Sequence, residues 1–192
     1  NLSGTFAGMS SLSDTTGGSL KASGATYTIT GANTGSVTNL SGTFAGMANL
    51  SDTGPTGTLV ASNKTWTTTG VRTGSVGGLS GTFAGMASLS DSAGTGTLIG
   101  TGNTYTITGS NAGSSTNVTG TFAGMSNLSD AGPTGTLVAT GATYTTTGVR
   151  TGSVTNLSGT FAGMANLSDT TGGVLKGTGN TYTITGANTG SS

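Results

Sequence analysis

The sequence predicts an all-β fold in which short strands stack into a repetitive β-solenoid, with little or no α-helix. Three observations support this prediction. A block of nine residues recurs five times at a nearly constant spacing. Within each repeat, apolar and polar residues alternate with a period of two, which is typical of half-buried strands. Gly accounts for 38 of the 192 residues, and frequent Gly disfavours helices.

The recurring block is NLSGTFAGM, which begins at Asn1 and returns with small changes at Asn39, Gly78, Asn117 and Asn156. These starting points divide the chain into five repeats, 1–38, 39–77, 78–116, 117–155 and 156–192, which we expect to form one solenoid segment of a longer chain. A single repeat has too few apolar side chains for a core of its own. Stacking on neighbouring repeats would create a continuous core instead.

Each repeat contains three short stretches that we expect to be strands, here given for the first two repeats. In residues 26–30, Tyr27 and Ile29 share one face and three threonines share the other. Residues 35–42 and 56–62 are also bounded by the turn formers Gly, Asn or Asp. The segment after each Asp differs in length by one residue between repeats, so we expect a surface loop there.

Stacking of equal repeats predicts ladders of identical core residues along the axis. The period favours two coils of about 19 residues per repeat, and one wide coil per repeat is the alternative. The expected ladders consist of the phenylalanines Phe6, Phe44, Phe83, Phe122 and Phe161, the methionines Met9, Met47, Met86, Met125 and Met164, and the aromatic residues Tyr27, Trp66, Tyr105, Tyr144 and Tyr182.

The repeats also alternate between two types. After the stretch that contains the aromatic residue (26–30 in the first repeat), the odd-numbered repeats carry Asn33, Asn111 and Asn188, whereas the even-numbered repeats carry Arg72 and Arg150. The genetic unit is therefore expected to be a pair of repeats of about 78 residues.

The run TYTITGANTGSVTNLSGTFAGMANLSD, residues 26–52, recurs in variants along the chain. It resembles the β-strand repeats of very large secreted bacterial proteins, including filamentous-haemagglutinin-like and autotransporter adhesins. The resemblance implies a right-handed β-helix shaft at the cell surface or outside the cell, with a surface or adhesive role.

Composition argues against catalysis and cofactors. Without His or Cys the chain lacks the usual nucleophile–base pairs and the usual ligands of zinc, haem and iron–sulfur clusters. A net charge of zero gives no footprint for nucleic acid, and no apolar run is long enough for membrane insertion. We therefore expect a protein that is not an enzyme and that holds no cofactor.

One acidic residue occurs in each repeat, at Asp14, Asp52, Asp91, Asp130 and Asp169. We expect these residues to cap turns, because Asp accepts hydrogen bonds from nearby backbone N–H groups. A row of calcium ligands is the alternative, but calcium needs six to eight clustered oxygens, so calcium is not expected.

Thr-x-Thr pairs form a candidate surface-binding face, because such pairs on a flat solenoid face resemble the arrays of ice-binding proteins. The alternative is a solvated strand face held by hydrogen bonds between neighbouring strands. The pairs are Thr28 and Thr30, Thr67 and Thr69, Thr106 and Thr108, Thr145 and Thr147, and Thr183 and Thr185.

The expected function is that of a structural extracellular fibre or shaft of a large repetitive bacterial surface protein, assembled by stacking of β-strand repeats. Adhesion to host or neighbouring cells and ice binding are the alternatives. The expected partners are other copies, joined end to end or laterally, with cell-surface glycans as a further candidate. Unpaired strands at the two ends of a stack favour such continuation.

Overall fold

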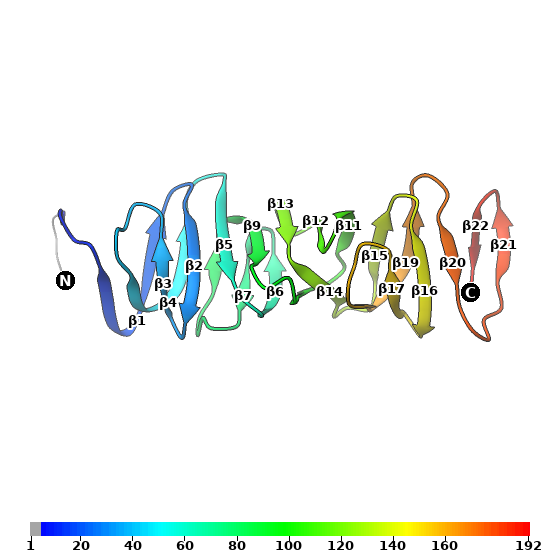
Figure 1. The fold of residues 1–192 in the computed structure, drawn as a ribbon, viewed down its shortest axis with the longest axis horizontal. Helices are drawn as coiled ribbons and strands as arrows, with labels where there is room; N and C mark the ends of the chain where they lie inside the picture. The colour runs from blue at the N-terminus through cyan, green and yellow to red at the C-terminus, as the bar shows by residue number, and fades with distance from the viewer. Residues whose placement is uncertain (1–4) are drawn as a thin grey trace.

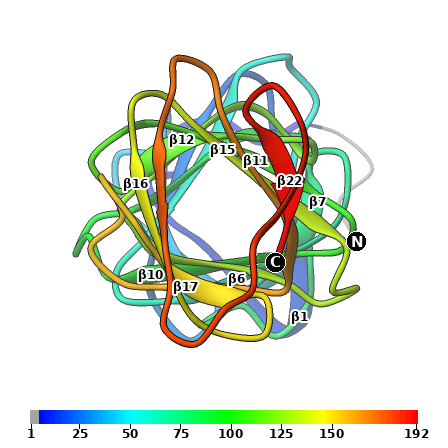
Figure 2. The ribbon, with the colours of Figure 1, turned by 90° about the vertical axis from the view of Figure 1, so that its right-hand side faces the viewer.

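The computed structural model describes residues 5–192, so the first four residues of the first repeat lie outside it. The chain forms an elongated β-solenoid of about five turns, built from stacked parallel strands (Figure 1). Viewed along the long axis, the turns surround one common interior (Figure 2). Residues 5–192 contain no helix, and hence none that could cross a membrane.

Strands form in four segments of the repeat. The first is the NLSGTFAGM block together with the Leu-Ser-Asp that follows it. The strands from this region are β1 (Leu12–Ala22), β4 (Phe44–Asp52), β8 (Phe83–Ala84), β9 (Met86–Asp91), β13 (Val118–Ala123), β14 (Met125–Asp130), β18 (Phe161–Ala162) and β19 (Met164–Asp169). The second place is the aliphatic stretch after the loop, which gives β5 (Gly57–Ala61), β10 (Gly96–Gly100), β15 (Gly135–Ala139) and β20 (Val174–Lys176).

The other two places form a β-hairpin in every repeat. Its first strand carries the aromatic residue and is β2 (Thr26–Gly31), β6 (Thr65–Gly70), β11 (Thr104–Gly109), β16 (Thr143–Gly148) or β21 (Thr183–Gly186). Its second strand is β3 (Thr34–Val37), β7 (Thr73–Val76), β12 (Ala112–Ser115), β17 (Thr151–Val154) or β22 (Thr189–Ser191). In the last repeat, β21 and β22 pair only with each other and form a separate sheet at the C-terminal end.

The turns are wider than the sequence suggested. Leu59 pairs with Leu89 and Trp66 pairs with Leu98, so parallel partners are separated by about 30 positions in the sequence. The expectation of two narrow coils per repeat is therefore wrong. Five repeats make about five turns, which is closer to the alternative of one wide coil per repeat. Parallel partners are nevertheless closer in sequence than one repeat, so turns and repeats do not coincide.

Core rows combine different positions of the repeat, so the predicted ladders of equivalent residues are absent from the described turns. One row runs from Tyr27 through Leu59 and Leu89 to Phe122, each adjacent to the next on a parallel strand. Phe122 then pairs with Gly113 on the antiparallel strand β12. A Cβ atom at Gly113 would lie 2.8 Å from Phe122 Cζ and would collide with the carbonyl oxygen of Thr106, so this position requires Gly.

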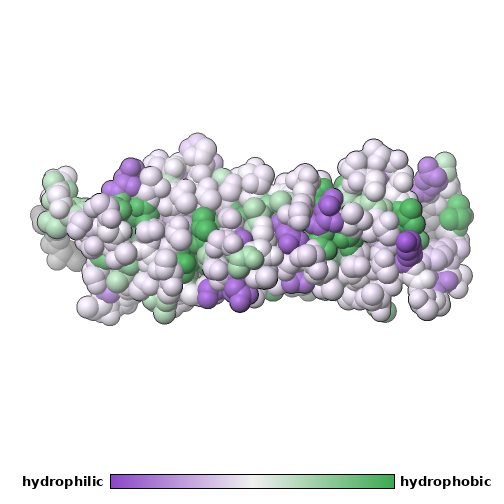
Figure 3. Space-filling model, viewed as in Figure 1, coloured by the Kyte–Doolittle hydropathy of each residue, from purple (hydrophilic) through white to green (hydrophobic). Residues whose placement is uncertain are grey.

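Most of the predicted core residues are buried, but those of the terminal turns are not. Phe6, Met9 and Tyr182 are exposed by 60%, 58% and 43%, whereas their counterparts in the other repeats are buried. The reason is geometric: a core residue needs a turn on both sides, and each terminal turn has a neighbour on one side only. The side of the solenoid is largely intermediate in hydropathy, with few strongly hydrophilic residues (Figure 3).

Strand limits agree with the sequence in two stretches and differ in a third. The expected strands at residues 26–30 and 56–62 correspond to β2 and β5. The expected strand at 35–42 ends at Val37, because a turn follows in which Asn39 has a φ of 73°. The long strand β4 was not expected, because Gly46, with a φ of 68°, interrupts the alternation of apolar and polar residues.

The loop after each Asp is present in the second repeat, where residues 53–56 lie outside strands. In the first repeat, the corresponding residues belong to β1, whose pairing with β4 is irregular around Gly18. The shorter loop is therefore absorbed as a bulge, which inserts residues into a strand without ending its pairing.

Candidate functional site

A recurring polar contact joins four of the Asp residues, Asp52, Asp91, Asp130 and Asp169, to the preceding turn. Asp130 Oδ2 accepts the N–H of Asn103, which lies 27 residues earlier, at 2.8 Å. Its Oδ1 accepts the N–H groups of Gly132 and Thr134 in its own loop, at 3.1 and 3.3 Å. Asp130 is buried. One carboxylate thus caps a local turn and connects two turns at once; we refer to this arrangement as the Asp clip.

The Asp clip recurs along the solenoid. Asp52 accepts from Ala25 at 2.8 Å, Asp91 from Lys64 at 2.8 Å, and Asp169 from Ala142 at 2.8 Å. Among residues 5–192, no three His, Cys, Asp or Glu side chains gather as a metal site would require.

The acidic residues near the two ends are more accessible, and hydrogen bonds stabilise their ionised forms. The N–H groups of Ala142 and Thr171 hold the pKa of the Asp169 carboxyl below its ordinary value. The N–H and hydroxyl groups of Thr16 lower the pKa of Asp14 in the same way. Asp14 Oδ1 accepts both of these hydrogen bonds, at 2.8 and 3.1 Å.

A second polar contact joins repeats that are two apart. Asn33 lies in the hairpin turn with a φ of 53°, a left-handed conformation that Asn tolerates well. Its side-chain amide donates to Ser80 Oγ at 2.9 Å and accepts the Ser80 N–H at 2.8 Å. Asn111 makes the same two bonds with Ser158, both at 2.8 Å. We refer to this pair of hydrogen bonds as the Asn–Ser clip.

The second repeat uses a different side-chain contact at the same turn. Arg72 also has a left-handed backbone, with a φ of 60°, which is unfavourable for a residue with a Cβ atom. Its guanidinium Nη2 donates to the carbonyl oxygens of Gly54 and Gly85. Asn33, Asn111 and Arg72 thus make two kinds of side-chain contact at equivalent turns.

The aromatic position of the hairpin connects neighbouring turns through its hydroxyl group. Tyr27 donates to Ser51 O at 2.6 Å, and Tyr105 donates to Ser129 O at 2.7 Å. Burial raises the pKa of Tyr27 to about 12. Trp66 occupies this position in the second repeat, and its buried Nε1 has no hydrogen-bond partner within the described part of the chain.

Three polar side chains, two of them buried, form a cluster around Thr68. Thr68 replaces the Ile found at this position in the odd-numbered repeats, and its Oγ1 donates to Ile99 O at 3.1 Å. The amide groups of Asn103 and Asn117 donate to the Thr68 Oγ1 at 3.4 and 3.5 Å. This arrangement satisfies a polar side chain that would otherwise be costly to bury.

The structure does not bring the Thr-x-Thr pairs together. Thr28 lies opposite Ser36 on one side and Val60 on the other. Thr67 likewise has Ser75 and Ile99 as neighbours. Because the wide turn places different strands beside each other, threonine pairs of successive repeats are not adjacent, and no continuous Thr-x-Thr array forms over residues 5–192.

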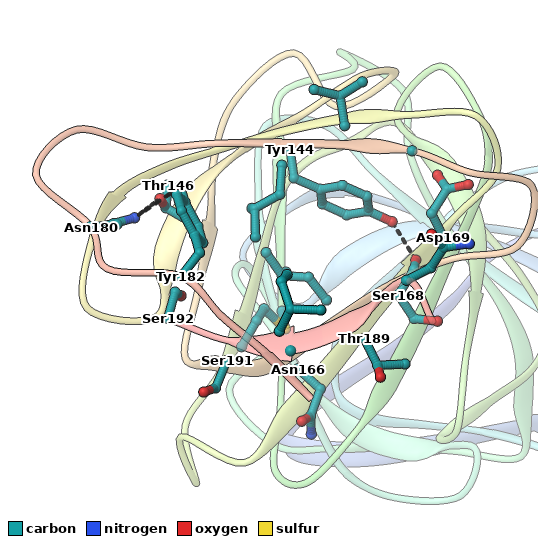
Figure 4. A pocket seen from close by; sticks show the side chains of 18 of the residues that line it. Tyr144, Thr146, Asn166, Ser168, Asp169, Asn180, Tyr182, Thr189, Ser191 and Ser192 are labelled. Carbon is teal, nitrogen blue, oxygen red and sulfur yellow. Dashed lines mark hydrogen bonds between the residues drawn. The ribbon is translucent and has the colours of Figure 1, made fainter. Parts of the chain in front are cut away.

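The C-terminal end contains an open hollow of about 1830 Å³. Its walls include the core-facing residues Tyr144, Met164 and Leu167 from the last closed turn and Tyr182 and Ile184 from the terminal hairpin. In the close-up view, Tyr144 reaches across one side of the hollow towards Ser168, and Tyr182 and Asn180 line another side (Figure 4). The Tyr144 hydroxyl donates to Ser168 O.

Sequence reasoning identified the Asp positions but missed their backbone partners in the preceding turn, the Asn–Ser clip and the tyrosine hydroxyl contact. The alternation of Asn and Arg was the one available signal for contacts between repeats two apart. Knowledge of the turn width would have been needed to assign those contacts.

Comparison with known proteins gives no match, whether to a protein family, to a curated protein or to a solved structure.

Proposed function

We propose that this chain is a structural shaft segment of a large, repetitive bacterial protein at the cell surface or outside the cell. The proposed relatives are the filamentous-haemagglutinin-like and autotransporter adhesins whose repeats its sequence resembles. The observation that carries the proposal is the Asp clip, because an equivalent Asp side chain in each of four repeats joins one turn to the turn before it.

The physical basis of the proposed role is the dependence of each turn on its neighbours. Core rows such as Tyr27–Leu59–Leu89–Phe122 pass through several turns, so no turn has a separate core. In a solenoid of this kind, stability is distributed over the interfaces between repeats. Backbone hydrogen bonds and Asp clips act between turns and would resist both bending and extension of the shaft.

The proposal assigns no catalytic role to the chain. The repeated Asp side chains are engaged by backbone N–H groups rather than grouped around a shared site. The ice-binding alternative receives less support than the shaft, because Val60 and Ile99 interrupt the Thr-x-Thr pairs on the outer face.

Electron microscopy of the native material, with averaging along the particle axis, tests the proposal. We expect a continuous rod with an axial spacing of about 4.8 Å, the distance between neighbouring strands. Compact particles without axial continuation would contradict the shaft function.

A further inference from the structure

We propose that Thr68, Gly100 and Asn103 form a recognition unit by which one repeat selects the type of repeat that stacks on it. A repeat whose hairpin carries Thr at this position would accept a repeat with a Gly-x-x-Asn sequence, and a repeat that carries Ile would accept one with Ala in place of that Gly. The partner that is recognised is a neighbouring segment of the same chain. This inference goes beyond the shaft function and does not depend on it.

The recognition unit lies inside the solenoid, where β6 of the second repeat pairs with β10 of the third. Thr67 is paired with Ile99, and the next residues on the two strands are Thr68 and Gly100. The side chains of Thr68 and Asn103 are both buried. Thr68 Oγ1 donates to Ile99 O at 3.1 Å and accepts from Asn103 Nδ2 at 3.4 Å. The hydroxyl and the amide therefore satisfy each other away from water.

Gly100 provides the space that the Asn103 side chain occupies. A Cβ atom at Gly100 would collide with Asn103 Nδ2. An Ala at this position would therefore displace the amide from the Thr68 hydroxyl. Gly and Asn are required together, so the third repeat presents them as one unit to the second.

The same unit occurs between the fourth and fifth repeats. Thr146 Oγ1 donates to Lys176 O at 3.1 Å and accepts from Asn180 Nδ2 at 2.9 Å. A Cβ atom at Gly177 would collide with Asn180 Nδ2, as at Gly100. The three residue types therefore recur together with the same contacts among them.

Interfaces whose hairpin carries Ile have a different composition at the three positions. Thr28 is paired with Val60, and the next residues on the two strands are Ile29 and Ala61. The residues at the three positions are Ile29, Ala61 and Lys64 between the first and second repeats, and Ile107, Ala139 and Ala142 between the third and fourth. Apart from Lys64, all of them are buried. In the four interfaces between repeats, Thr therefore occurs only with Gly and Asn, and Ile only with Ala and a residue other than Asn.

A mismatch between the two types would leave buried polar groups without partners. A shift of the stacking by one repeat would place Thr68 against Ala139, or Asn103 against Ile29. In the first case the hydroxyl loses the amide donor, and in the second the buried amide faces a methyl group. An unpaired buried polar group costs more than its hydrogen bond contributes when it is made. Because the repeats are otherwise nearly identical, this cost distinguishes the correct register from a shifted one.

Three variants of the full chain test the inference, and each keeps the amino-acid composition of the unmodified chain. The first exchanges the hairpin residues and is Thr68→Ile/Ile107→Thr. The second exchanges their partners and is Gly100→Ala/Asn103→Ala/Ala139→Gly/Ala142→Asn. The third combines all six substitutions, so that Thr again stands beside Gly and Asn, and Ile beside Ala, with the two interfaces interchanged.

Denaturant unfolding followed by circular dichroism gives the equilibrium constant for folding of each variant. The first and second variants mismatch two interfaces each, so we expect this constant to fall by roughly tenfold or more per interface. The combined variant should regain most of that loss, and its recovery is measurable even if the mismatched variants do not fold. The inference would be overturned by a mismatched variant as stable as the unmodified chain, or by a combined variant no more stable than the mismatched ones. Rods or compact particles in electron microscopy, which decide the shaft function, leave this result unchanged.

Discussion

Tyr105 donates its phenolic hydroxyl to the carbonyl oxygen of Ser129, 24 residues further along the chain, at 2.7 Å. The tyrosine side chain is fully buried, and its hydroxyl crosses from one turn to the next. An aromatic side chain thereby contributes both apolar area and a directed contact between turns.

Removal of this hydroxyl should destabilise the solenoid. Tyr105→Phe leaves the Ser129 carbonyl without this donor, and we expect a loss of about 1–2 kcal/mol in the free energy of unfolding. Chemical denaturation followed by circular dichroism would measure it. Tyr182→Phe is the control, since Tyr182 is 43% exposed and its loss should be much smaller. Equal losses would show that the hydroxyl contact is not the cause.

Trp66 offers the reverse substitution. Its Nε1 is buried without a partner among the described residues, while a Tyr hydroxyl at this position would reach Ser90 O by analogy with Tyr105 and Ser129. We expect Trp66→Tyr to raise the free energy of unfolding by about 1 kcal/mol, because the gain in hydrogen bonding exceeds the loss of packing. Trp66→Phe, which lacks the hydroxyl, should lower the same quantity. A stability of Trp66→Tyr at or below that of Trp66→Phe would refute the explanation.

The Asp clip predicts a difference between interior and terminal carboxylates. Asp130→Asn replaces one carboxylate oxygen with an NH2 group, which cannot accept a hydrogen bond from a backbone N–H. We therefore expect the free energy of unfolding to fall by about 2–3 kcal/mol. Asp14→Asn retains an acceptor for Thr16 and should cost much less than Asp130→Asn. Thermal and denaturant unfolding of the two variants would measure the difference, and similar losses would contradict a role between turns.

Substitution of two glycines with nearly equal backbone conformations can distinguish the cost of backbone strain from the cost of a steric collision. Gly94 and Gly124 have φ values of 74° and 70°. A Cβ atom at Gly94 meets nothing within 4 Å, whereas at Gly124 it would collide with the carbonyl oxygen of Asp91. Gly94→Ala should cost about 1–2 kcal/mol and Gly124→Ala more than about 4 kcal/mol, measured as free energies of unfolding. A small cost for Gly124→Ala would mean that the turns are not in close contact there.

Stability should be greatest between mildly acidic pH and about pH 10. The lowered pKa values of Asp14 and Asp169 stabilise the folded state when their carboxyls are ionised, and this contribution is lost as the pH falls through their folded pKa values. The pKa of Tyr27 is raised to about 12, so above pH 10 the unfolded chain loses protons that the folded chain retains. Stability should therefore decline from pH 10 to 12. Thermal midpoints measured from pH 2 to 12 test both limits, and a midpoint that is flat above pH 10 would contradict burial of the hydroxyl.

The sequence was sufficient to predict an all-β solenoid of five repeats because the periodicity reports local structure directly. Alternation identified β2 and β5, and the change in loop length after Asp52 identified a surface loop. The turn width could not be read in the same way. The repeat period shows how often an environment recurs, but parallel partners are closer in sequence than one period. Unlike residues such as Tyr27 and Leu59 therefore lie side by side.

The candidate contacts depend on that turn width. Leu89 can be recognised as a core residue from its pattern, but its neighbours Leu59 and Phe122 follow from the register alone. The bonds of Asn33 to Ser80 require the additional fact that the hairpin turn reaches a repeat two positions ahead. Local sequence carries no information about that distance.

The contact between Asn33 and Ser80 restricts how the length of such a protein can change by recombination. Loss of the second or the third repeat would place the Asn33 hairpin against the Asn-Val-Thr of residues 117–119, where Thr119 stands at the position of Ser80. Loss or duplication of two repeats would leave every hairpin facing its own type. Unequal crossing-over would therefore be tolerated best in steps of two repeats, and copy number in the gene would keep its parity.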